Sequence, residues 1–255
     1  MPENRAIIEL RGVRKSLGGQ TVLAGVDLAI EHGETVVIMG RSGAGKSVIL
    51  KHMVGLMKPD GGEIYFDGQR LDVMDRHRLQ ETRKRTGMLF QGAALFDSMS
   101  VGENVALGLR KHTRLADEEI RRIAEEKLAA VGLEGTSGKM PAELSGGMRK
   151  RVGLARAIAM DPEVVYYDEP TTGLDPITAD AINDLILSTR HSLGVTGVVV
   201  THDVASALKV GTRICLLEKG MIVFDGTPED VLRSDHPVMQ QFLAGTAGNV
   251  ANRNN

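Results

Sequence analysis

Apolar and polar residues alternate near the N-terminus, as expected for strands with one exposed face. The alternating set is Ile8, Leu10, Val26, Leu28 and Ile30. Gly18-Gly19 lies within this region and predicts a tight turn. A further strand-like run, Ile64 to Phe66, ends at the hairpin sequence Asp67-Gly68. Together these segments predict an antiparallel sheet.

Three other segments are continuously apolar: Val36 to Met39, Val164 to Tyr167 and Val198 to Val200. Such runs are typical of parallel strands that are covered on both faces. Apolar residues then surround most of a predicted helix from Val48 to Met57, which should end before Pro59. The pattern therefore predicts an α/β fold with a mainly parallel core sheet.

Helical spacing dominates residues 100–160. Ile120, Ala124, Leu128 and Val131 recur at three- and four-residue steps, and Gly132 follows as a C-terminal stop. We expect one domain over residues 5–244, with a helical subdomain inserted at about 100–160. Residues 245–255, rich in Gly, Asn and Ala, are expected to form a flexible tail.

Composition and the absence of certain sequence patterns argue against several classes of function. The net charge of -2 provides no overall basic field for nucleic-acid binding. The single cysteine, Cys215, cannot form an internal disulfide and lies in an apolar run, where a buried, inert thiol is expected. Met1 to Ile8 lacks a signal pattern, and no run of eighteen apolar residues occurs, so we expect no direct membrane insertion.

A phosphate-binding loop follows the first apolar run. It matches the pattern G-x-x-x-x-G-K-[ST] and consists of Gly40, Arg41, Ser42, Gly43, Ala44, Gly45, Lys46 and Ser47. Its glycines would let backbone N–H groups approach the phosphates of ATP, and the next helix would direct its positive N-terminus at them. Lys46 would add a charge, and the Ser47 hydroxyl would bind Mg²⁺. The alternative is a glycine-rich loop with an incidental lysine.

Asp168 and Glu169 directly follow the second apolar run. An unpaired carboxylate at the end of a buried strand is unfavourable, so we expect Asp168 to bind Mg²⁺ directly or through water. Glu169 would then lie beside the γ phosphate. The alternative is an ordinary surface pair of acids.

The pentapeptide Leu144 to Met148 reads Leu-Ser-Gly-Gly-Met and opens a helix. Taken with the phosphate-binding loop and the acidic pair, it makes the chain resemble the nucleotide-binding subunits of ABC transporters from about Ile7 to Leu243. The resemblance implies a P-loop NTPase fold with an N-terminal antiparallel β subdomain. It also implies an ATPase that releases ADP and phosphate.

The same resemblance assigns roles to further residues. Glu169 would polarise the attacking water, Gln91 would contact Mg²⁺ or that water, and His202 would be the switch histidine. Ser145, Gly146 and Gly147, with Asp175 of the segment Gly173-Leu174-Asp175, would reach nucleotide held by a second copy. A serine and two glycines at a positive helix end form a second anion site, which predicts a homodimer closed by ATP.

A closer likeness concerns Arg83 to Gln91, Gly92 to Asp97 and Val101 to Val105, which resemble the ATPases of Mla phospholipid transporters and of related Mce-type systems. This implies a peripheral protein on the cytoplasmic side of the inner membrane, bound to an integral membrane permease. It would power phospholipid transport between inner and outer membrane. A STAS-domain regulator and a periplasmic Mce-domain lipid-binding subunit are further implied partners. The alternatives are a transporter of another substrate and a DNA-maintenance ATPase, which would usually carry a longer insertion.

Two details of this resemblance stay open. Leu17 stands where many family members place an aromatic residue against adenine, so apolar packing or contacts from Arg14 or Lys15 would have to substitute. The segment Gly92 to Val105 is where the permease would dock. Its apolar side chains, which include Phe96, suit a socket, but burial in the core explains them equally well.

Overall fold

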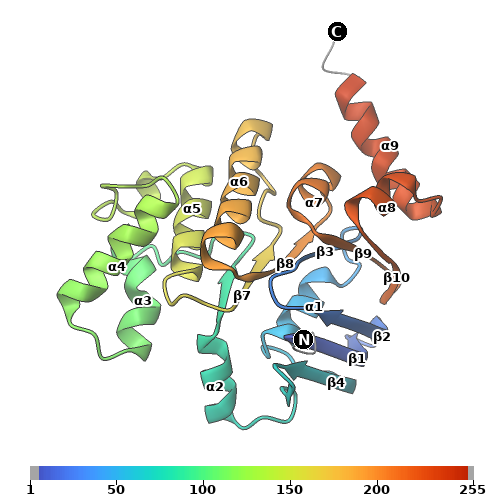
Figure 1. Cartoon of the computed structure of the whole chain (residues 1–255), viewed down its shortest axis with the longest axis horizontal. Coiled ribbons are helices and arrows are strands. Elements are labelled where there is room, and N and C mark those ends of the chain that lie inside the picture. The colour runs from blue at the N-terminus through green and yellow to red at the C-terminus, as the bar shows by residue number, and fades with distance from the viewer. Residues whose placement is uncertain (1–5, 252–255) are drawn as a thin grey trace, which may run out of the picture. The chain divides into compact units, whose positions relative to one another are not determined.

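The computed structural model describes residues 6–251, with the backbone alone for 245–251, and the chain forms two compact units. The first unit combines Met1–Met74 with Val198–Asn255. The second unit is the continuous segment Asp75–Gly197, and the boundary falls inside the strand β8 (Thr196–Thr201). Figure 1 shows the elements of both units.

An antiparallel sheet in the first unit has the strand order β2-β1-β4-β5. Its strands are β1 (Ile8–Leu17), β2 (Gln20–Ile30), β4 (Gly61–Phe66) and β5 (Gln69–Arg70). Ile8 is the register partner of both Ile30 and Phe66, and all three side chains are buried. The antiparallel sheet predicted from alternation is therefore confirmed.

The first unit also holds the strands that carry the phosphate-binding loop, in the order β10-β9-β3-β8. They are β3 (Thr35–Met39), β9 (Arg213–Glu218) and β10 (Met221–Gly226), together with β8. β3 pairs with β9 in parallel and is buried along its whole length, because helix α7 (Val204–Val210) also packs on it. The continuous apolar run thus reflects coverage on both faces.

The first helix, α1 (Lys46–Met53), ends earlier than the apolar pattern predicted. Gly55 adopts a left-handed φ of 70°, and the N–H of Leu56 donates to the carbonyl of Lys51. This is a Schellman ending, in which a glycine terminates the helix and satisfies its last carbonyls. The apolar residues after Met53 therefore belong to the turn rather than to the helix.

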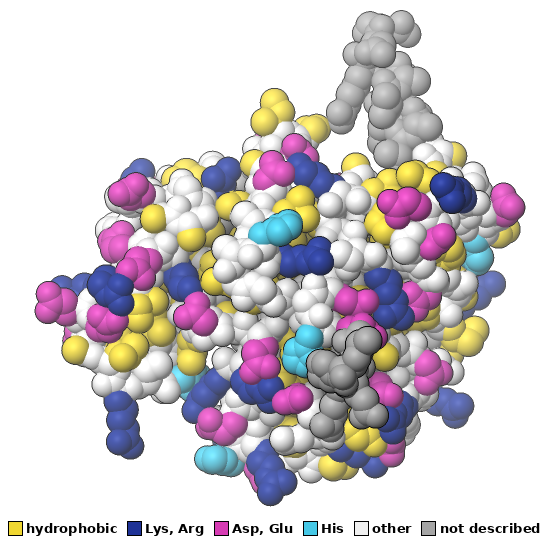
Figure 2. All heavy atoms as spheres, in the orientation of Figure 1, with side chains coloured by type: hydrophobic (Ala, Val, Ile, Leu, Met, Phe, Trp, Pro, Cys, Tyr) yellow, Lys and Arg dark blue, Asp and Glu magenta, His cyan; other side chains and the backbone are white. Residues whose placement is uncertain are grey.

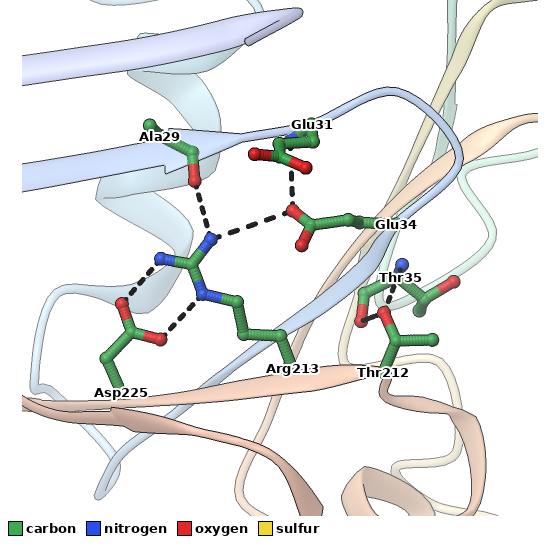
Figure 3. A network of polar contacts seen from close by, with 7 residues as sticks. All are labelled: Ala29, Glu31, Glu34, Thr35, Thr212, Arg213 and Asp225. Carbon is green, nitrogen blue, oxygen red and sulfur yellow. Dashed lines mark hydrogen bonds and ion pairs between the residues drawn. The ribbon is translucent and has the colours of Figure 1, made fainter. Parts of the chain in front are cut away.

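A polar network joins distant segments of the first unit (Figure 3). The Arg213 guanidinium on β9 makes two hydrogen bonds of 2.6 Å to the Asp225 carboxylate on β10. It also donates to the carbonyl of Ala29 at 2.9 Å and forms an ion pair with Glu34 at 3.6 Å. Arg213 consequently holds the hairpin of β9 and β10 to β2, and it lowers the pKa of the Asp225 carboxyl.

The second unit contains two parallel strands and most of the helices. The strands are β6 (Thr86–Leu89) and β7 (Val164–Asp168). The helices are α2 (Arg76–Lys84), α3 (Val101–His112), α4 (Asp117–Ala130), α5 (Gly146–Ala157) and α6 (Pro176–Leu193), with a short 3-10 turn at Pro141–Glu143. α3 packs against α4 and α5, and α5 packs against β6 and α6.

The helices α3, α4 and α5 fall within residues 100–160, for which the sequence predicted a helical insertion. The compact unit that contains them is larger, however, because it also includes α2, both strands and α6. The apolar stripe of α4 behaves as its spacing predicts, since Ile120, Ala124 and Leu128 are buried.

The chain ends in α8 (Pro228–Arg233) and α9 (Pro237–Ala251). α9 includes the first seven residues of the segment 245–255, for which the sequence predicts a flexible tail, and that flexibility stays a prediction. Alanine favours the helix there, and a glycine inside a helix costs only about 1 kcal/mol. Residues 252–255 lie outside the described part of the chain.

Charged side chains of both signs are interspersed on the face of the molecule shown in Figure 2. This agrees with the small net charge of the sequence. Among the residues that the structure describes, none of the helices has the length and apolar character that a membrane span requires.

Candidate functional site

The phosphate-binding loop lies between β3 and α1 in the first unit and depends on its glycines. A Cβ on Gly40 would stand 2.7 Å from the carbonyl oxygen of Leu217, which is closer than real atoms approach. Gly43 and Gly45 have φ values of 80° and 102°, in the left-handed region that favours glycine. The first turn of α1 carries no acidic residue, so its positive end is directed at the loop without neutralisation.

The Lys46 ammonium makes hydrogen bonds across this loop, to carbonyls at its start. It donates to the carbonyls of Gly40 at 2.8 Å and Arg41 at 3.2 Å, and the residue is buried. Ser47 is half-buried at the start of α1, whereas Ser42 is exposed. The Arg41 side chain donates to Gln241 of α9, so the C-terminal helix contacts the loop.

His202 follows β8 in the first unit, and its side chain is exposed. The next residue, Asp203, caps α7 by accepting hydrogen bonds from the Ala205 N–H at 3.0 Å and the Ser206 hydroxyl at 2.6 Å. The Asp203 N–H donates to the Thr201 hydroxyl at 3.0 Å. These bonds fix the backbone on both sides of the predicted switch histidine.

Leu17, the residue predicted to stand in for an aromatic, is 41% exposed at the end of β1. Lys15, one of the two cations considered for adenine, forms a 2.7 Å ion pair with Asp60. Arg14 is exposed. Of the three side chains considered for contact with adenine, Leu17 and Arg14 are therefore the accessible ones.

The acidic pair lies in the second unit, where Asp168 ends β7 and Glu169 is the next residue. Glu169 is only 7% exposed and has a left-handed φ of 47°, which is unusual for a residue with a side chain. The Thr172 hydroxyl donates to its carboxylate at 3.0 Å. The turn after β7 thus positions the predicted catalytic carboxylate by both backbone and side-chain contacts.

The Ser-Gly-Gly segment opens α5, as the sequence predicted. Ser145 is the N-cap residue, and its hydroxyl accepts a hydrogen bond from the Met148 N–H at 3.3 Å. Ser145 and Gly146 are exposed, whereas Gly147 is buried against α6, where a Cβ would meet the Thr178 methyl carbon at 2.5 Å. The exposed part of this helix end is therefore available to an anionic ligand.

Asp175 caps α6 in the same unit. Its carboxylate accepts hydrogen bonds from the N–H of Ile177 at 3.1 Å, the N–H of Thr178 at 3.0 Å and the Thr178 hydroxyl at 2.6 Å. The Thr178 bonds, with the hydroxyl first, lower the pKa of Asp175. Gly147 therefore contacts the residue that orients Asp175.

Gln91 is exposed directly after Phe90 in the second unit, and its backbone is held by a residue that the sequence analysis missed. Lys150 on α5 is 5% exposed and donates to the carbonyls of Gln91 and, at 3.1 Å, Glu169. Burial lowers the pKa of Lys150, an effect opposed by the nearby Asp168 and Glu169 carboxylates. The sequence offered one indication of this role, a lysine placed among the apolar residues of a predicted helix, where lysine is uncommon.

The residues predicted to bind Mg²⁺ are Ser47 in the first unit, and Gln91 and Asp168 in the second. A hydroxyl, an amide oxygen and one carboxylate are hard oxygen donors, and a Mg²⁺ ion bound mainly through phosphate needs few such groups. No group of three or more His, Cys, Asp or Glu side chains suited to a metal occurs in the described part of the chain. The predicted Mg²⁺ ligands, Ser47, Gln91 and Asp168, differ from such a group because only one of them is a carboxylate.

Comparison with known proteins agrees with the fold and with the presence of the phosphate-binding loop, the Ser-Gly-Gly segment and the acidic pair in one chain. The family model described as ABC transporter matches residues 23–172, more than half of the chain. The chain belongs to this family, as its resemblance predicted.

Relatives with assigned names extend the comparison. The chain is 41% identical to the intermembrane phospholipid transport system ATP-binding protein MlaF of Haemophilus influenzae, over 95% of this chain and 92% of that protein. It is 43% identical to the probable ribonucleotide transport ATP-binding protein mkl of Mycobacterium tuberculosis, over 93% of this chain. The chain spans 66% of the length of that mycobacterial relative.

Solved structures are similar as well. The dimeric, post-hydrolysis structure of the ATP-binding cassette MJ0796 bound to ADP and Pi has a TM-score of 0.80 and 36% identity, covering 87% of this chain and 98% of that chain. CbiO1 of Clostridium perfringens has a TM-score of 0.83 at 28% identity, covering 97% and 99%. The predicted α/β fold of an ABC ATPase is therefore confirmed.

Proposed function

We propose that this protein is the ATP-hydrolysing subunit of a membrane transporter and that its single ATPase domain spans residues 5–244. The observation that carries the proposal is the loop from Gly40 to Ser47. Its glycines take left-handed backbone conformations at Gly43 and Gly45 and a close approach to Leu217 at Gly40, Lys46 supplies a cation, and the start of α1 supplies a positive helix end. This is the chemistry that a nucleoside triphosphate requires.

In the proposed reaction Lys46 exchanges its loop carbonyls for phosphate oxygens. Glu169 accepts a hydrogen bond from the attacking water and polarises it, while Gln91 and His202 contribute polar contacts to the reacting groups. Ser47, Gln91 and Asp168 would hold Mg²⁺, which supplies positive charge next to the phosphates. Phosphoryl transfer depends mainly on such positioning and charge stabilisation.

The active form is proposed to be a homodimer. Ser145, Gly146 and the positive end of α5 would bind the γ phosphate of nucleotide held by a second copy, and Asp175 would lie at the same interface. This proposal is supported by the exposure of Ser145 and Gly146, and by the dimeric state of the similar cassette. ATP would then join the two copies and hydrolysis would release them.

The test is a Glu169→Gln variant of the purified protein. We expect it to retain ATP binding and ATP-dependent dimerisation while losing most turnover, because an amide polarises water poorly. Glu126→Gln is a matched control, since Glu126 is an exposed acid on α4 paired with Arg122. Turnover at the wild-type rate in Glu169→Gln would contradict the proposal. A wild-type protein that neither binds nor hydrolyses ATP would also contradict it.

We further propose that the subunit is peripheral, on the cytoplasmic side of the inner membrane, and docks on a permease. A pocket of about 520 Å³ in the second unit supports this. It lies among α2, α3 and α5, and its cationic side chains are Arg83, Lys84, Lys111 and Arg156. Such a lining suits an acidic, amphipathic segment of the partner.

The predicted docking segment, Gly92 to Val105, divides into two parts. Val101 is fully buried in the core, whereas Phe96 is 50% exposed and is available to a partner. Burial in the core accounts for Val101, and we propose that Phe96 contacts the permease.

Phospholipid is the proposed cargo, moved between inner and outer membrane with the help of a periplasmic Mce-domain subunit and a STAS-domain regulator. The support is the similarity to proteins named for intermembrane phospholipid transport. Co-purification from native membranes, with mass spectrometry of bound proteins and lipids, tests it. A permease that co-purifies without Mce-type subunits or phospholipid would favour another substrate.

A further inference from the structure

The buried ammonium of Lys150 connects two segments that the proposed mechanism uses separately. It donates to the carbonyl of Gln91 and, at 3.1 Å, to the carbonyl of Glu169. Both acceptors belong to residues whose side chains are proposed to reach the attacking water. One cation therefore fixes the backbone on which both side chains are mounted.

These backbone segments have conformations that need support. Glu169 has φ of 47°, and the two residues that follow Gly92, Ala93 and Ala94, have φ of 61° and 48°. Left-handed geometry in residues with a Cβ is unfavourable and persists only where surrounding contacts enforce it. Charge-assisted hydrogen bonds to the carbonyls are contacts of that kind.

Helix α5 supplies a second cation to the same loop. The Arg156 guanidinium donates to the carbonyls of Ala93 and Ala94, each at 2.6 Å. Between the two cations, Gly153 allows close packing, since a Cβ there would stand 2.8 Å from a Leu89 methyl carbon. Lys150, Gly153 and Arg156 follow one another at three-residue steps and so lie along one side of the helix.

We propose that Lys150 is a positioning residue for ATP hydrolysis, which sets the placement of Gln91 and Glu169 relative to each other from the helix that Ser145 opens. The inference rests on the proposed ATPase function. It adds that a change in the position of α5 moves both residues together. Nucleotide bound at Ser145 would in this way be connected to the hydrolytic residues of the same chain.

The test compares Lys150→Met, which keeps the length of the side chain without its donors, with Lys150→Arg, which keeps a cation and several donors. Lys127→Met is the matched control, because Lys127 forms an ion pair with the exposed Asp161. For each purified protein, kcat, the KM for ATP, the unfolding temperature and hydrogen exchange of the amides in residues 91–94 are measured.

We expect Lys150→Met to lower kcat by about 10- to 100-fold, the effect of a small misplacement of reacting groups. Its KM for ATP should change by less than about threefold, because the phosphate-binding loop is untouched. Amide exchange in residues 91–94 should rise. Lys150→Arg should recover most of the turnover, and Lys127→Met should match the wild type in all four measurements.

Wild-type kcat in Lys150→Met would overturn the inference. So would a loss of turnover that Lys150→Arg shares in full, with a lowered unfolding temperature and unchanged exchange, since that result indicates a packing role alone. Failure of the ATPase proposal is distinguishable, because the wild-type protein itself would then not hydrolyse ATP and Glu169→Gln would have no effect.

Discussion

Gly147 offers a sharp test of the packing between the Ser-Gly-Gly segment and α6. A Cβ at this position would stand 2.5 Å from the methyl carbon of Thr178, whereas carbon atoms normally approach to about 3.5–4.0 Å. Thr178 cannot simply turn away, because its hydroxyl and its N–H both donate to Asp175. The Gly147→Ala variant must therefore shift α5 or disturb the cap of α6.

Two effects of this substitution oppose each other. Overpacking costs about 1–3 kcal/mol, while replacing glycine by alanine in a helix gains up to about 1 kcal/mol. The overlap is about 1.0–1.5 Å, so we place the free-energy cost of overpacking at about 2 kcal/mol. The net loss is then about 1 kcal/mol, which lowers the unfolding temperature by about 2–4 °C in a chain of this size.

A double-mutant cycle isolates the contact. Thr178→Ser removes the clashing methyl and keeps the hydroxyl that binds Asp175, so it should rescue Gly147→Ala with a coupling energy of about 1–2 kcal/mol. Thermal unfolding and denaturant titration of the four proteins measure this energy. Gly146→Ala is the control, because its Cβ would meet only Leu174 at an ordinary 3.6 Å. Strict additivity of the two substitutions would refute the reasoning.

Two further predictions concern the surface and the polar network. Phe96→Asp, at an exposed position, should leave the fold and basal ATP hydrolysis intact but abolish stimulation by the permease; unchanged assembly and transport would argue against docking there. Asp225→Asn should lower the unfolding temperature at pH 7 by about 2–4 °C, from a loss near 1 kcal/mol after allowance for solvent screening. Because Arg213 lowers the pKa of this carboxyl, its contribution is complete above the unfolded pKa of about 4 and is lost as the pH falls through the folded value. The difference between the two proteins should therefore shrink below about pH 4, and an equal difference at pH 7 and pH 3 would contradict the assignment.

The sequence predicted those parts of the fold that local patterns determine. Alternation located the antiparallel sheet, and continuous apolar runs located β3, β7 and β8, because the residues of a strand are apolar on each face that is buried. The end of α1 was missed since it depends on one glycine turn, and apolar residues continue beyond it. Local pattern alone cannot separate a buried turn from a buried helix.

The candidate site shows the same division. The phosphate-binding loop and the Ser-Gly-Gly segment could be recognised in the sequence because the functions proposed for them require particular residues in a fixed order. The contacts of Lys150 could not be predicted, because its partners are backbone carbonyls, which every residue carries. One of those carbonyls belongs to Glu169, which has a left-handed φ, and the other to Gln91, two residues before the left-handed Ala93, and these conformations are properties of the folded chain. The roles assigned to the site residues, Gln91 and His202 among them, remain predictions.

The first unit is assembled from two segments that the second unit separates along the chain, and this has a consequence for its biosynthesis. β3 leads into the phosphate-binding loop, yet its parallel neighbour β9 and the Leu217 carbonyl beside Gly40 belong to the later segment, which follows the second unit along the chain. On the ribosome the second unit is complete while the first still lacks this neighbour. The wall behind the nucleotide loop therefore exists only after translation has passed Leu217.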